Sequence, residues 1–140
     1  MPTAIMNRTG FDVIEAYEAP KMLIARYMFK HECSNVQAQA VFNEMKKFLW
    51  VCAKHPGRRH APSQIVDGMW HELVQFSHEY FALCRLLGVD YIHHRPTKGA
   101  DQLAYRRTRQ AIAAEFGSDD KGFWPERAAA DCTGESECGS

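Results

Sequence analysis

The chain has 140 residues, 46% of them apolar and 24% charged, which is typical of one globular domain. Its 17 basic and 17 acidic side chains give a formal net charge of zero, so it lacks the positive excess common in proteins that bind nucleic acid or anionic membranes. No run approaches the roughly 18 apolar residues of a membrane span, and the N-terminal sequence has no signal-peptide pattern. We expect a cytoplasmic protein with no membrane partner, and we do not expect nucleic acid as a partner.

The N-terminal part is predicted to contain an arm and a first helix. Residues 1–19 form the arm, which includes three apolar residues at helical spacing, Phe11, Ile14 and Tyr17. Pro20 suits the first position of a helix that ends near Glu32, because its missing N–H is not needed there. The inner face of this helix is expected to carry Met22, Leu23, Tyr27 and Met28.

Two longer helices are predicted in the middle of the chain. Ser34 or Asn35 caps a second helix that runs to about Lys54, and the prolines and glycine of residues 55–63 end it. Ser63 then caps a third helix over residues 64–87, which stops at Gly88. The apolar residues expected on their inner faces are Val41, Met45, Phe48, Leu49, Cys52, Val66, Met69 or Trp70, Leu73, Tyr80, Cys84 and Leu87.

The last part of the domain is predicted to be a connector, a helix and a tail. Residues 89–92 are rich in strand formers, but a lone strand has no partner, so we expect an extended connector. A last helix opens near Asp101 and runs to about Phe116, and Phe123 and Trp124 pack back on the domain. The expected fold is all-α, a compact bundle of about four helices over residues 20–125, followed by a flexible tail over residues 126–140.

Four of the seven histidines lie between residues 66 and 96. On a continuous helix Asp67, His71 and His78 fall within roughly 40° of one another. Zinc and similar metals take three or four ligands, often histidines and a carboxylate. The predicted ligands are Asp67, His71, His93 and His94, with His78 as a further member. We expect one residue of the His93–His94 pair to face His71, and we favour His94.

Several interpretations of these residues stay open, because their spacing matches no standard zinc signature. A polar helix face needs no function, and the same side chains can form a buried network or an unliganded catalytic site. Our leading hypothesis is a metal-binding helical domain, with zinc or iron as the first metals to test and metal-assisted chemistry on an unknown substrate. The alternative is a non-catalytic protein-interaction module with a structural polar network. Its partner or dimer surface would draw on Phe11, Tyr17, Phe123 or Trp124.

One combination of residues resembles a known family. It consists of Val66-Asp67-x-x-Trp70-His71, Tyr80-x-x-x-Cys84-x-x-x-Gly88 and Ile92-His93-His94-x-Pro96. This pattern resembles the glycine-rich domain-containing-protein-like family, which includes small bacterial proteins and the N-terminal regions of larger plant proteins. The resemblance extends over residues 40–125. It implies that the family's signature includes Asp67, Trp70, His71, Tyr80, Cys84, His93, His94 and Pro96. Members often carry a second histidine two residues after the first, where this chain has Leu73.

The cysteines and arginines give weaker signals. Cys33, Cys52 and Cys84 lie in apolar helical surroundings and are expected to be free thiols of a reducing compartment. For Cys132 and Cys138 a labile disulfide, a metal contact and an unpaired tail all remain open. The basic cluster Arg106-Arg107-x-Arg109 is interpreted as solvated helix surface, with an RNA or phosphate contact as the other interpretation.

Overall fold

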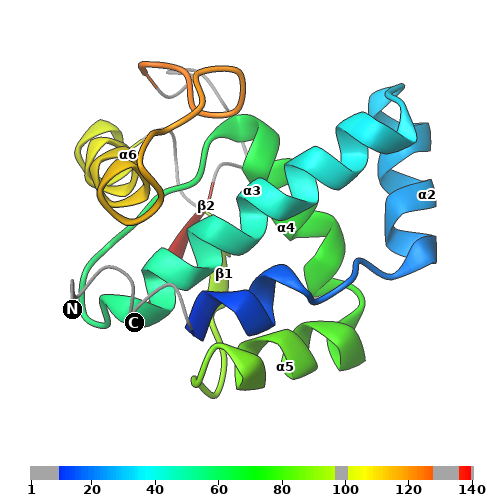
Figure 1. Ribbon diagram of the computed structural model, residues 1–140, viewed down its shortest axis with the longest axis horizontal. Helices are drawn as coiled ribbons and strands as arrows, with labels where there is room; N and C mark the ends of the chain where they lie inside the picture. Colours follow the sequence, from blue (N-terminus) through cyan, green and yellow to red (C-terminus); the bar gives the residue numbers. More distant parts are fainter. Residues whose placement is uncertain (1–9, 97–100, 128–135, 140) are drawn as a thin grey trace.

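The computed structural model describes residues 10–96, 101–127 and 136–139, and within them the all-α fold is confirmed (Figure 1). The helices are α2 (Lys21–His31), α3 (Asn35–Lys54), α4 (Gln64–Val74), α5 (Ser77–Leu86) and α6 (Gln102–Phe116). A short helical segment over residues 10–15 precedes them. The strands β1 (His93–Pro96) and β2 (Ser136–Gly139) form a small antiparallel pair.

Helix α3 is the centre of the fold, and α2, α4 and α6 all pack against it (Figure 1). Its start is fixed by a capping box, in which Ser34 Oγ accepts from the Gln37 N–H at 3.1 Å and Gln37 Oε1 accepts from the Ser34 N–H at 2.9 Å. The predicted inner face is confirmed, since Val41, Met45, Phe48, Leu49 and Cys52 are all buried.

Helix α2 begins one residue later than expected, and Pro20 precedes it as the cap. Leu23, Ile24 and Tyr27 are its buried residues. Met22 was expected on the inner face, but its side chain is 68% exposed. The reason is helical phase, because Met22 lies about 200° around the helix from Ile24.

The predicted third helix is broken, and this corrects the sequence analysis. Helix α4 ends at Val74, Gln75 and Phe76 form a turn, and α5 begins at Ser77. In one continuous helix Trp70 and Tyr80 would be about 15 Å apart along the axis. The turn instead lets Trp70 Nε1 donate to the Tyr80 hydroxyl at 3.0 Å, with both side chains fully buried. Packing and hydrogen bonding of these two residues therefore favour the break.

Helix α6 follows the predicted limits closely. Asp101 caps it by accepting from the Ala104 N–H at 3.0 Å, and Gly117 ends it at φ 92°, a left-handed conformation that suits glycine. Beyond it, Trp124 is fully buried and its indole N–H donates to Glu44 Oε1 of α3 at 3.0 Å. The predicted return of this segment to the core is confirmed.

The strand pair was not predicted, although the expected connector over residues 89–92 lies outside both strands and leads directly into β1. Strand β1 pairs with β2, placing His93 opposite Gly139 and His94 opposite Cys138. Part of the predicted tail is thus a strand. This strand was not predicted, because a pairing between such distant segments leaves no local pattern in the sequence. The prediction for Cys132 lies outside the described residues.

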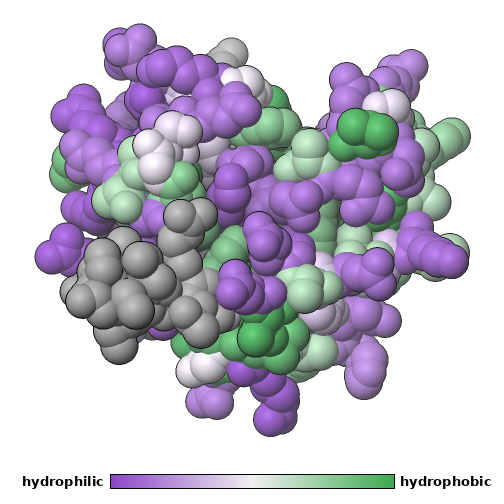
Figure 2. All heavy atoms as spheres, viewed as in Figure 1, coloured by the Kyte–Doolittle hydropathy of each residue, from purple (hydrophilic) through white to green (hydrophobic). Residues whose placement is uncertain are grey.

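Figure 2 shows a face on which hydrophilic side chains predominate over α6 and the segment after it, with smaller apolar patches elsewhere.

Phe11 and Trp124, expected as part of a partner surface, are buried in the core instead. That part of the prediction is wrong, since both side chains complete the packing around α3. None of the described helices is long and apolar enough to cross a membrane.

Candidate functional site

The candidate site is built around a contact between α4 and β1 (Figure 1). Ser63 caps α4 by accepting from the Val66 N–H at 3.2 Å, which places Asp67 in the first turn. Its Oδ1 lies 3.1 Å from Nε2 of His94 on β1. The side chains of Asp67 and His94 are only 11% and 12% exposed. The fold therefore holds a carboxylate and an imidazole together at the edge of the core.

Two further side chains of α4 adjoin this pair. The ring centroid of His71 is 5.5 Å from that of His94, and His71 itself is exposed. Trp70 packs edge-to-face against the His94 ring, with centroids 4.5 Å apart. We call Asp67, Trp70, His71 and His94 the Asp/His cluster. The expectation that His94 is the histidine facing His71 is confirmed.

A hydrogen-bonded chain supports the cluster from the core side. Trp70 donates to the Tyr80 hydroxyl, and Tyr80 donates to the carbonyl oxygen of Ile92, two residues before His94. Burial raises the pKa of Tyr80 far above its ordinary value, and burial also raises the pKa of the Cys84 thiol. Both groups are therefore neutral at physiological pH. The hydrogen bonds from Trp70 to Tyr80 and from Tyr80 to Ile92 hold the connector, and with it His94, against α4 and α5.

The other two predicted ligands lie elsewhere. His93 is exposed, stacks edge-on to Tyr91 with centroids 5.0 Å apart, and lines a cavity of about 200 Å³ that Cys52 and His55 share. Side chains alternate along a strand, so His93 and His94 point to opposite sides. His78 is exposed on α5, beyond the break in the predicted helix. The stripe of Asp67, His71 and His78 is therefore not formed.

Across residues 10–96, 101–127 and 136–139, no group of three or more His, Cys, Asp or Glu side chains has the arrangement of a metal site. The cluster brings together two atoms of types that can bind metals, Asp67 Oδ1 and His94 Nε2, with His71 as a neighbour.

A second histidine pair was missed by the sequence analysis. The rings of His55 and His60 are 5.8 Å apart, and His60 is 1% exposed. Within the described part of the chain, His60 Nδ1 is buried without a hydrogen-bond partner. Burial lowers the pKa of His55. The neighbouring side chains of His60 and Arg58 lower this pKa further, whereas the Glu115 carboxylate raises it. The only sequence signal was two histidines flanking a proline and glycine turn, a segment that we interpreted as a helix break and, at Arg58-Arg59-His60, as a solvated basic patch.

The comparison with protein families covers most of the domain. A family model described as UCP032817-like matches residues 9–116. The chain belongs to the UCP032817-like family. The match includes the Asp/His cluster and helices α2 to α6 but stops before Trp124. The segment that carries this buried tryptophan therefore lies outside the matched part of this UCP032817-like protein. No curated protein and no solved structure matches the chain significantly.

Proposed function

We propose that this UCP032817-like domain binds one divalent transition metal at the Asp/His cluster, through Asp67, His94 and His71. The observation that carries the proposal is the 3.1 Å separation of Asp67 Oδ1 and His94 Nε2. Ligand atoms about 2.0–2.1 Å from a tetrahedral zinc ion are roughly 3.3 Å apart. The two atoms are thus spaced nearly as two ligands of one ion would be.

The position of His71 supports a third ligand. Two imidazoles on one tetrahedral ion have ring centroids roughly 5 Å apart, by the same bond lengths. The His71 and His94 centroids are 5.5 Å apart, and His71 is exposed, so its ring is free to rotate toward the ion. Three protein ligands would leave one tetrahedral position for water, the usual arrangement of catalytic zinc.

The Trp70–Tyr80–Ile92 chain would act as the support of this site. Residues that contact the metal ligands without binding the ion raise the affinity for the metal, because they limit the motion of the ligands. Zinc and ferrous iron are the metals to test, because imidazole and carboxylate ligands suit both. The free thiols of Cys33 and Cys84 support the expected cytoplasmic location, where a reducing environment keeps thiols unpaired.

A second candidate function is a non-catalytic interaction domain in which the cluster is only structural. The observation favouring it is that Trp70, Tyr80 and Ile92 satisfy one another without any metal. Asp67 and His94 are likewise hydrogen-bonded to each other. In that case the cluster only fixes the connector to the helices.

Titration with Co²⁺ decides between the two, because tetrahedral Co²⁺ with nitrogen ligands gives visible absorption bands. We expect one ion per chain, displaced by Zn²⁺, and affinity weakened on the order of 100-fold in His94→Ala and Asp67→Ala. His93→Ala and His78→Ala are matched controls that should bind normally. Circular dichroism verifies that each variant folds. Absence of stoichiometric binding of Co²⁺, Zn²⁺ and Fe²⁺, or an equal loss in the His93 control, would leave the structural role.

A further inference from the structure

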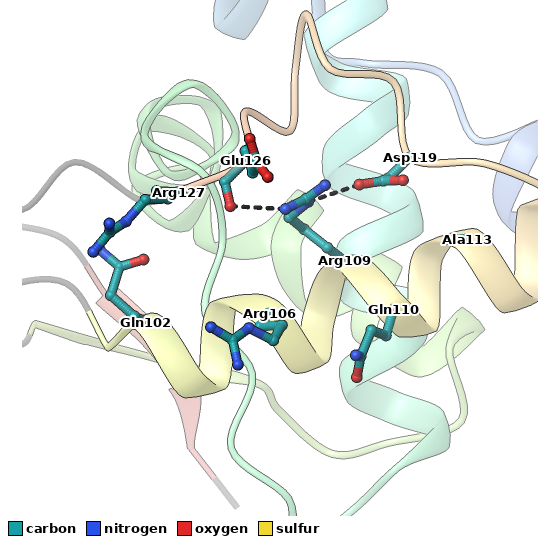
Figure 3. A pocket seen from close by; sticks show the side chains of 8 residues that line it. All are labelled: Gln102, Arg106, Arg109, Gln110, Ala113, Asp119, Glu126 and Arg127. Carbon is teal, nitrogen blue, oxygen red and sulfur yellow. Dashed lines mark hydrogen bonds and ion pairs between the residues drawn. The ribbon is translucent and has the colours of Figure 1, made fainter.

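A cavity of about 680 Å³ lies between α6 and the segment over residues 119–127 (Figure 3). We propose that this cavity binds a small organic phosphate, held between Arg106 and Arg127. The site is separate from the Asp/His cluster, since neither Asp67 nor His94 lines it.

The floor of the cavity is one face of α6. Gln102, Arg106, Gln110 and Ala113 follow one another at helical spacing and turn toward the same side. Figure 3 shows Arg106 and Gln110 in succession along the helix, with Gln102 at the end where Arg127 approaches it. Ala113 contributes only a methyl group, which leaves room beside Gln110. This face therefore offers amide and guanidinium N–H groups to one space.

The opposite wall is fixed by Arg109. Its Nε donates to Asp119 Oδ2 and its Nη1 donates to the Glu126 carbonyl oxygen, both at 2.7 Å (Figure 3). The side chains of Arg109 and Asp119 are 17% and 18% exposed, so this ion pair is largely shielded. It ties the segment after α6 to the helix, so that both form walls of the same cavity.

The charge that remains is what selects an anion. Three arginines and two acidic residues line the cavity, which gives 3 − 2 = +1. Arg109 already neutralises Asp119. Arg106 and Arg127 make no ion pair with any described residue, and Glu126 is the one carboxylate left beside them. Two guanidiniums without an ion-pair partner on one cavity give it a positive potential that attracts an anion.

Phosphate fits this donor set better than carboxylate. A guanidinium presents paired N–H groups that match two phosphate oxygens, and the third oxygen can accept from a glutamine amide. The cavity is within the roughly 300–1,000 Å³ range of small-molecule sites, so it has room for an organic group besides the phosphate. Asp119, Glu126 and Arg127 lie outside the family match, so one wall of the site comes from the C-terminal segment of this chain.

The test is calorimetric titration of the full chain with two matched ligand pairs, adenosine monophosphate against adenosine and glucose 6-phosphate against glucose. We expect at least one phosphorylated ligand to bind and its unphosphorylated partner not to bind. Arg106→Gln and Arg127→Gln should each weaken binding by about tenfold or more, as expected for a lost charge-assisted hydrogen bond. Arg85→Gln, an exposed arginine on α5, is the matched control and should have no effect.

A single-stranded oligonucleotide is titrated in parallel. If it binds more tightly than every small phosphate, and Arg85→Gln weakens it as much as Arg106→Gln, the arginines form a general nucleic-acid surface and the proposal is overturned. The proposal also fails if no phosphorylated ligand binds, or if both cavity variants bind like the unaltered chain. Arg106 and Arg127 are exposed, so their replacement should leave the fold intact.

Discussion

Oδ1 of Asp67 lies 3.1 Å from Nε2 of His94, although 27 residues separate them in the sequence. The contact joins the first turn of α4 to β1 and brings a carboxylate and an imidazole together with little exposure to water. Its geometry depends on the connector before His94, which Tyr80 holds through the Ile92 carbonyl. The stability of the fold and the shape of the candidate site are therefore coupled through one phenol group.

Tyr80→Phe tests this coupling. The variant keeps the ring but leaves the Trp70 indole N–H and the Ile92 carbonyl buried without their partner. We expect the free energy of unfolding in urea to fall by about 1–3 kcal/mol, because buried groups lose hydrogen bonds without access to water. Any Co²⁺ affinity of the Asp/His cluster should fall with it.

Tyr91→Phe is the control for that experiment. Tyr91 also packs on the Tyr80 ring, with centroids 5.1 Å apart, but is only partly buried. Its replacement should change the free energy of unfolding by less than about 0.5 kcal/mol. Equal effects of the two variants would contradict a special role for the Tyr80 hydroxyl.

Lys46→Met tests how the N-terminal segment is held. Lys46 is 2% exposed, and its ammonium donates to the carbonyl oxygens of Glu15 and Tyr17 at 2.8 and 2.9 Å. Methionine keeps most of the apolar stem but leaves both carbonyls without a donor. We expect a loss of about 1–3 kcal/mol in stability and faster amide hydrogen exchange over residues 10–17.

Lys47→Met is the matched control on the next residue of α3. Lys47 pairs with Glu44 at 3.0 Å and its side chain is 29% exposed. The Glu44 side chain is only 10% exposed, so this pair is largely buried, and its loss should also lower the free energy of unfolding, by about 1–3 kcal/mol. Hydrogen exchange over residues 10–17 should be unaltered. The two variants remove the same charge, so a difference in hydrogen exchange over residues 10–17 reports on the contacts of Lys46 with Glu15 and Tyr17.

Local signals account for what the sequence could predict. Ser34, Ser63 and Asp101 each cap the helix that follows, because a side-chain oxygen near the backbone N–H groups of the first turn is recognisable from sequence. Gly117 ends α6 for an equally local reason. Four helix limits could thus be placed within a residue or two.

Tertiary contacts account for what could not be predicted. No proline or glycine marks the turn at Gln75 and Phe76, which depends on the approach of Trp70 to Tyr80. The divergence of His93 from His94 follows from their lying on a strand whose partner is distant in the sequence. The sequence therefore predicted the part of the candidate site on α4, Asp67 and His71. On β1 it predicted His94 correctly but also included His93, which points to the other side of the strand.

His55 gives a prediction at acid pH. Its folded-state pKa is lowered, mainly by burial, with further contributions from His60 and Arg58 that outweigh Glu115. The unfolded chain therefore binds the proton first, and stability should fall as pH drops below about 6.5. His55→Gln removes this group, so the loss of stability between about pH 7 and 5 should be smaller in the variant. Parallel urea titrations of both proteins measure the difference, and identical pH profiles would contradict the prediction.

Buried tyrosines give the opposite prediction at alkaline pH. Burial raises the pKa of Tyr27 to about 12, and burial raises the pKa of Tyr80 further. Phenols of the unfolded chain ionise near pH 10, so the unfolded state loses protons first. The contribution of each group is complete below about pH 10 and is lost as pH rises above it, with a limiting slope of about 1.4 kcal/mol per pH unit for one phenol. Tyr27→Phe should reduce the measured slope of unfolding free energy against pH by up to that amount. An unchanged slope would mean that Tyr27 ionises equally in the folded and unfolded chains, which its nearly complete burial argues against.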